Sequence, residues 1–138
     1  MPTPPLMDVA HIIRNASANT ALAAPSGFSP KPDIITPHYK LSADRFFALV
    51  QAVAMRQPRT YQAAVYTDQR QVHYVVRSAL FNFPDLVMVQ VRPEAQDTSD
   101  LILYSRSVYG RGDLGVNRQR VETWLGAIDK KLPPSSER

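Results

Sequence analysis

The segment with the greatest capacity for chemistry spans residues 105–121 and reads SRSVYGRGDLGVNRQRV. Arginine guanidinium groups bind carboxylates and phosphates through paired hydrogen bonds, so a cluster of arginines suits an anion. The first N–H groups of a helix have no partner within the helix, and they attract the same ligands. Because this segment is predicted to run from a strand through a glycine-rich turn into a helix, it is the candidate anion-binding region of the chain.

Two arginines lie on predicted strands, and their neighbours indicate which face of a sheet they occupy. Because side chains alternate between the two faces of a strand, Arg77 shares a face with Val75, and Arg106 shares a face with Tyr104. A guanidinium on an apolar face must be paired, since an isolated charge is very costly to remove from water. The candidate partners are Asp68, Asp85, Asp113 and backbone carbonyl groups at the strand ends.

The helical part of the segment adds polar groups to the same corner. At about 100° per residue, Asn117 falls within the apolar stripe and Arg118 at its edge, whereas Arg120 is expected to point away. Because the helix must fold back along the strand that leads into it, we expect Asn117 and Arg118 to lie near the strand serines. The candidate ligand-binding residues are Arg77, Ser105, Arg106, Ser107, Asp113, Asn117 and Arg118.

This cluster has two interpretations. In the structural one, which we favour, Arg106 and Arg118 bond to carbonyl groups and Asp113 caps the helix. In the ligand-binding one, the arginines and the helix N-terminus hold a phosphate or a carboxylate. The glycines match neither the phosphate-binding loop nor the dinucleotide-binding fingerprint, so neither of those nucleotide sites is expected.

The same segment resembles the hallmark of domain-of-unknown-function family 1499, written S-R-S-x-x-G-x-x-D-x-G-x-N-R-x-R-V. Every specified position of that pattern is filled here. Shorter matches to the family lie at residues 32–34, 58–60, 77–78 and 83–85. The resemblance implies a small bacterial or plastid-type domain without an assigned activity, which is often joined to a membrane anchor or a lipoprotein signal.

Composition excludes several classes of function. The chain has no cysteine, which excludes disulfides, thiolate metal ligands and a cysteine nucleophile. His11, His38 and His73 lack the spacing of metal ligands, and no acid and base pair is evident, so we expect no cofactor, no metal and no catalytic residue.

The net charge of +4 is spread along the chain, and binding of nucleic acid is therefore not expected. No apolar run reaches about 18 residues, so no transmembrane segment is expected.

The periodicity of the chain predicts an α+β fold. An amphipathic helix follows Ser42, which is a suitable N-cap, and a second helix is predicted to begin at Asp113 and to end near Lys131. Between them, strands are predicted at residues 61–66, 72–83, 86–91 and 101–108. Because the connections are short, these strands should form a four-stranded antiparallel meander with both helices on one face. We expect a proline-rich N-terminal arm at residues 1–37, one domain at 38–132 and a flexible tail at 133–138.

These features favour a non-catalytic binding module for a protein partner or for a small anionic or lipidic ligand. The alternative is an enzyme that acts on an anionic substrate through Arg77, Arg106 and Arg118. A membrane-associated complex is a further candidate partner. We expect a cytoplasmic location or a peripheral one at a membrane, and a periplasmic location stays open.

Overall fold

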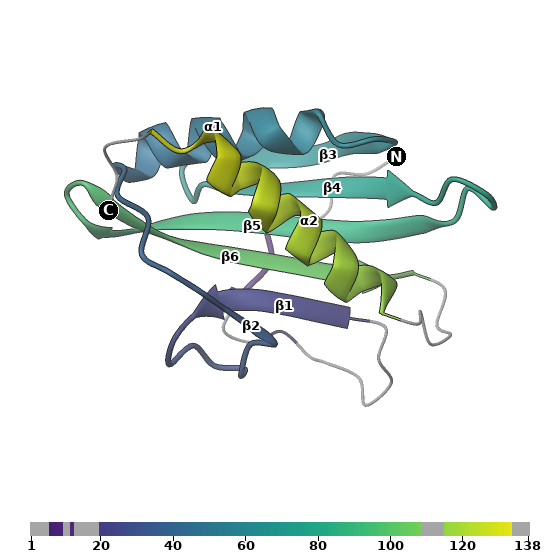
Figure 1. Ribbon diagram of the computed structural model, residues 1–138, viewed down its shortest axis with the longest axis horizontal. Coiled ribbons are helices and arrows are strands. Elements are labelled where there is room, and N and C mark those ends of the chain that lie inside the picture. The colour runs from purple at the N-terminus through teal and green to yellow at the C-terminus, as the bar shows by residue number, and fades with distance from the viewer. Residues whose placement is uncertain (1–5, 10–11, 13–19, 109–114, 134–138) are drawn as a thin grey trace.

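The computed structural model of the chain describes residues 6–9, 12, 20–108 and 115–133 (Figure 1). These residues form a six-stranded sheet with two helices packed on one of its faces. The elements are β1 (Thr20–Pro25), β2 (Ile34–Thr36), α1 (Ala43–Met55), β3 (Thr60–Tyr66), β4 (Gln71–Arg77), β5 (Pro84–Ala95), β6 (Thr98–Ser107) and α2 (Val116–Lys131). The predicted α+β class is thus confirmed. None of the helices in this part of the chain is both long and apolar enough to cross a membrane.

The predicted four-stranded antiparallel sheet is wrong, because two further strands come from the segment expected to be an arm. The strand order is β2-β1-β6-β5-β4-β3, in which β3 to β6 form the expected meander. Strand β1 pairs antiparallel with β6, and β2 pairs parallel with β1, so the sheet is mixed. Residues Ala21–Ala24 of β1 are all buried, on both faces of the sheet. A strand buried on both faces has no alternation of polar and apolar residues, and alanine is uncommon in strands.

Strand β4 ends earlier than predicted, at Arg77, and residues 78–83 form a turn before β5. The turn is closed by the backbone N–H of Ser78, which donates to the carbonyl of Phe83 at 2.9 Å. Asn82 adopts the left-handed region with φ 57°, which interrupts an extended chain. Pro84, which falls between the predicted strands at residues 72–83 and 86–91, is the first residue of β5, a position where its missing N–H is tolerated.

The main core lies between the helices and the sheet. Ser42 caps α1 as predicted, since its Oγ accepts a hydrogen bond from the backbone N–H of Arg45 at 3.4 Å. Helix α2 packs Trp124 against Tyr74 of β4, with ring centroids 5.6 Å apart in an edge-to-face arrangement. The buried residues of α2 are Asn117, Val121, Trp124 and Ile128. This packing fixes the first turn of α2 against the end of β6, within the arginine-rich segment at residues 105–121.

The opposite side of the sheet, which we call the far face, carries a second and smaller apolar cluster. Met88 and Tyr104 belong to it, together with Leu22 of β1. Residues near the N-terminus cover part of this cluster, and Met7 is tied to the sheet by the buried side chain of Gln71. The Gln71 Oε1 accepts from the Met7 N–H at 2.7 Å, and its Nε2 donates to the Met7 carbonyl at 2.9 Å. The far face is therefore partly covered by the chain itself.

Candidate functional site

The motif at the end of β6 and the start of α2 forms, together with Asp85 of β5, a partly buried polar cluster, which we call the clamp: Asp85, Ser105, Ser107, Asn117 and Arg120. The Ser105 Oγ donates to Asn117 Oδ1, and the Asn117 Nδ2 donates to Ser107 Oγ at 2.9 Å. Ser105 and Asn117 are completely buried. Hydrogen bonds between buried polar groups avoid the cost of leaving those groups unsatisfied, so these bonds hold the helix on the strand.

Arg120 supplies the positive charge of the clamp. One of its nitrogens, Nη1, donates to Ser105 Oγ at 3.1 Å and to Asn117 Oδ1 at 3.0 Å. The same nitrogen lies 2.9 Å from Oδ2 of Asp85, and the two side chains are only 12% and 14% exposed. Because both charges are partly removed from water, each depends on the other for compensation. The charge of Arg120 is thus compensated within the clamp, although Arg120 is not one of the arginines to which the structural interpretation gave this role.

The expected positions of Arg118 and Arg120 are reversed in the structure. Arg118 is exposed and pairs with Glu122 one turn along α2, at 3.2 Å, whereas Arg120 enters the clamp. The predicted apolar stripe included Leu125 beside Val121, Trp124 and Ile128, and Leu125 is only half-buried, so the stripe was placed too far toward Arg118. With the stripe centred on the buried residues of α2, Arg120 lies close enough to its edge for the long side chain to reach Asp85.

Asp113 lies outside the described residues, so its expected capping role is untested. Helix α2 begins at Val116, and its N-cap is Gly115, with φ 84° and no capping hydrogen bond from a side chain. That backbone conformation is one that glycine adopts without strain. The Gly115 carbonyl accepts from the N–H of Gln119 at 2.9 Å.

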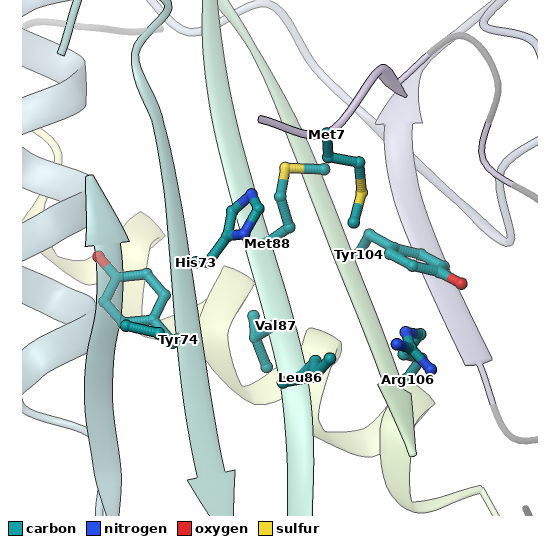
Figure 2. A pocket seen from close by; sticks show the side chains of 9 residues that line it. Met7, His73, Tyr74, Leu86, Val87, Met88, Tyr104 and Arg106 are labelled. Atoms are coloured by element: carbon teal, nitrogen blue, oxygen red, sulfur yellow. The ribbon is translucent and has the colours of Figure 1, made fainter. Parts of the chain in front are cut away.

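The strand arginines lie on the far face, away from the clamp. Arg77 donates from Nη1 to the carbonyl of Asn82 at 2.9 Å and so supports the turn after β4. Arg106 pairs in register with Leu86 and lines a small cavity (Figure 2). Of the seven candidate residues, the structure brings together Ser105, Ser107 and Asn117, and it places Arg77, Arg106 and Arg118 elsewhere.

The far-face cavity has a volume of about 60 Å³. Figure 2 shows Met7, Met88 and Tyr104 grouped along it, with His73 on one side and Arg106 next to Leu86 on the other. Its walls are therefore mainly apolar. At roughly 30 Å³ for each water molecule in the liquid, it holds about two water-sized groups, which corresponds to the end of a hydrocarbon chain.

Arg106 brings a positive charge to this apolar surface. Its side chain is half-buried, and no group in the part of the chain that the structure describes forms a hydrogen bond or an ion pair with its guanidinium. Arg106 lies on an apolar face, as predicted, but none of the described residues supplies the predicted partner. The cost of an unpaired guanidinium is moderate here because Arg106 lies next to the end of β6 and retains contact with water.

His73 is the second basic side chain of the cavity. Its Nε2 lies 2.7 Å from Oε1 of Gln71, the side chain that also holds Met7. Burial lowers the pKa of His73 below the ordinary value of 6.5, because desolvation disfavours the charged imidazole. His73 is therefore neutral at pH 7, and Arg106 is the cation of this cavity.

The two described histidines should titrate on opposite sides of pH 6.5. The hydrogen bond to Asp100 raises the pKa of His38, whereas burial lowers the pKa of His73. The contribution of His38 to stability is therefore present below pH 6.5 and is lost as the pH rises through its raised pKa. The contribution of His73 is present above pH 6.5 and is lost as the pH falls through its lowered pKa. Imidazole proton shifts measured against pH by NMR check this order, and Asp100→Asn should return His38 toward 6.5. Midpoints in the reverse order contradict the assignment.

The sheet, its two helices and the clamp make this a small α+β domain whose strand-to-helix corner is held by polar bonds. The chain belongs to the family of proteins of unknown function designated DUF1499, whose model matches residues 9–128. No curated protein matches the sequence. A solved structure of a protein from Nitrosospira multiformis is similar, with a TM-score of 0.58 and 8% identity over 86% of this chain and 99% of that chain. At that identity the likeness shows the fold alone.

Proposed function

We propose that this domain is a non-catalytic binding module for a small amphipathic anion. A carboxylate or phosphate group binds Arg106, and a short apolar part of the ligand enters the far-face cavity. The observation that carries the proposal is the half-buried Arg106 guanidinium, which has no partner among the described residues and lines an apolar cavity. Pockets for small ligands combine apolar walls with a few polar groups that fix orientation, and this cavity has that composition.

The clamp supports this choice of site by elimination. Arg120 is already bonded to Asp85, Ser105 and Asn117, so an anion at the clamp would have to displace an internal carboxylate. Arg118 has Glu122 as a partner. Arg106 can bind an anion without breaking any bond to the described residues. A bidentate pair with a carboxylate or a phosphate would also repay the cost of keeping the guanidinium partly out of water.

The alternative is an enzyme that acts on an anionic substrate, and one observation favours it. His73 lines the same cavity as Arg106, and its lowered pKa keeps it neutral and able to accept a proton. Its Nε2, however, is engaged with Gln71. A general base must reach the reacting proton, so this alternative requires the other ring nitrogen, Nδ1, to face the substrate.

Calorimetric titration with hexanoate, hexyl phosphate and hexanol tests the proposed site. We expect both anions to bind the wild-type domain and hexanol to bind at least about tenfold more weakly, because it lacks the charge that pairs with Arg106. Arg106→Gln should weaken binding of both anions by about tenfold or more and leave the melting temperature nearly unchanged. Equal binding of hexanol, no binding of either anion, or unchanged affinity in Arg106→Gln contradicts the proposal.

Arg118→Gln is the matched control, since it removes one arginine from the same end of the molecule without touching the cavity. The affinity of Arg118→Gln for both anions should stay within about twofold of the wild type, because salt screens an exposed charge that does not contact the ligand. Recovery of the ligand after long incubation separates the two functions. Unchanged hexyl phosphate supports a binding module, and release of inorganic phosphate that is lost in His73→Gln establishes the enzyme instead.

A further inference from the structure

The turn between β4 and β5 exposes a group of large apolar side chains, which we call the tip: Leu80, Phe81 and Phe83. Their exposed fractions are 80%, 65% and 51%. The rings of Phe81 and Phe83 stack on each other, with centroids 5.5 Å apart and an interplanar angle of 22°. Figure 1 shows this turn projecting past the other described loops at its end of the sheet. Single exposed apolar residues are ordinary, but three together on a projecting turn indicate an interaction surface.

Hydrogen bonds between residues 77–78 and residues 82–83 close the turn that carries the tip. The Asn82 N–H donates to the Ser78 carbonyl at 3.2 Å, and the Phe83 N–H donates to the Ser78 Oγ at 3.0 Å. The carbonyls of Phe83 and Asn82 accept from the Ser78 N–H and from Arg77, each at 2.9 Å. An unsatisfied backbone group is costly inside a bilayer, so these bonds make the base of the turn suited to lie against the lipid interface.

Arginines surround the base of the tip. The Arg59 Nε donates to the carbonyl of Arg77 at 3.0 Å, and Arg59 is an exposed residue. Within residues 56–61, 76–86, 104–108 and 115–123, which form this end of the sheet, the acidic residues are Asp85 and Glu122. Both are already paired with arginines. The same ranges contain Arg56, Arg59, Arg77, Arg106, Arg118 and Arg120, so this end is net positive.

We propose that the tip docks on an anionic lipid bilayer. Leu80, Phe81 and Phe83 enter the boundary between headgroups and acyl chains, and Arg59 and Arg77 bind the lipid phosphates. Aromatic rings favour that boundary, and basic residues near an anionic surface add about fivefold each to binding. A convex, projecting surface suits a deformable bilayer. The proposal concerns residues other than the far-face cavity, so it stands or falls independently of the small ligand.

Vesicle flotation tests the proposal with the full chain. The wild type should bind vesicles of equal parts phosphatidylcholine and phosphatidylglycerol, and bind pure phosphatidylcholine at least about tenfold more weakly. Phe81→Ser and Leu80→Ser should each weaken binding to the anionic vesicles by about tenfold, because each removes a large inserted side chain. Both residues are exposed, so the melting temperatures should stay within the error of the wild type.

Ile35→Ser is the matched control, because Ile35 is 57% exposed and lies on β2 at the far edge of the sheet. Its binding should match the wild type. Absence of vesicle binding, equal binding to neutral vesicles, or an equal loss in Ile35→Ser overturns the proposal. Sedimentation without lipid tests whether the tip instead binds a second copy of the chain. If the wild type is a dimer and Phe81→Ser is a monomer, the tip is a dimer interface and the bilayer proposal is overturned.

Discussion

Replacement of Arg120 by methionine should lower the free energy of unfolding by about 3–5 kcal/mol, because the Asp85 carboxylate loses its partner while it remains partly buried. The same substitution removes the donor to Ser105 and Asn117 at the centre of the clamp. A domain of this kind has a total stability of about 5–15 kcal/mol, so the loss should be plain in urea denaturation. A decrease below about 1 kcal/mol would show that the clamp is not a structural element.

A double-mutant cycle separates the ion pair from the rest of the clamp. The double variant Arg120→Met with Asp85→Leu should lose about 2–3 kcal/mol less free energy of unfolding than the sum of the two single losses. The reason is that the double variant leaves neither charge unpaired. Arg118→Met is the control on the same helix. Its pair with Glu122 is exposed, and its loss should cost at most about 0.5 kcal/mol. Equal costs at Arg118 and Arg120 would contradict the assignment of the clamp to Arg120.

Sequence periodicity predicted the parts of the fold in which one face is buried and the other is not. The buried residues Phe46, Val50 and Val53 recur at helical spacing, and α1 lies where that pattern predicts it. The strand order of the meander was predicted because its connections are too short for a parallel crossover, so consecutive strands must pair antiparallel. Strand β2 gave no comparable signal, since three residues are too few to establish a period. Its pairing with β1 depends on contacts that only the folded sheet provides.

The candidate site was predicted in its location but not in its partners. Ser105 and Asn117 meet because a helix that follows a strand closely must return along it. The choice between Arg118 and Arg120 depends on a rotation of the helix by a few tens of degrees, which the tertiary packing of Trp124 and Ile128 decides. The contact of Met7 with Gln71 joins residues 64 positions apart. No local sequence pattern predicts a contact between residues so far apart, so the packing of the N-terminal residues on the far face could not be predicted.

The burial of β1 leads to a second large effect, at Leu22. This side chain is completely buried on the far face in the cluster that contains Met88, Ile102 and Tyr104. Leu22→Asp should lower the free energy of unfolding by about 4–6 kcal/mol, because it removes a large apolar group from the core and places a charge there. The backbone of Leu22 also bonds to Asp33, whose carboxylate accepts from the Leu22 N–H at 2.9 Å and would repel a new one.

Ile35→Asp provides the comparison, because Ile35 belongs to the same N-terminal segment but is mostly exposed on β2. Its effect should stay within about 0.5 kcal/mol, as for other surface substitutions. Chemical denaturation followed by the fluorescence of Trp124 measures both variants, since this indole lies in the main core on the other side of the sheet. If residues 20–25 were only an arm laid on a finished domain, Leu22→Asp would detach them and leave the Trp124 transition unchanged. Because β1 is hydrogen-bonded to β6 within the sheet, we expect the whole transition to shift to lower denaturant as one cooperative step.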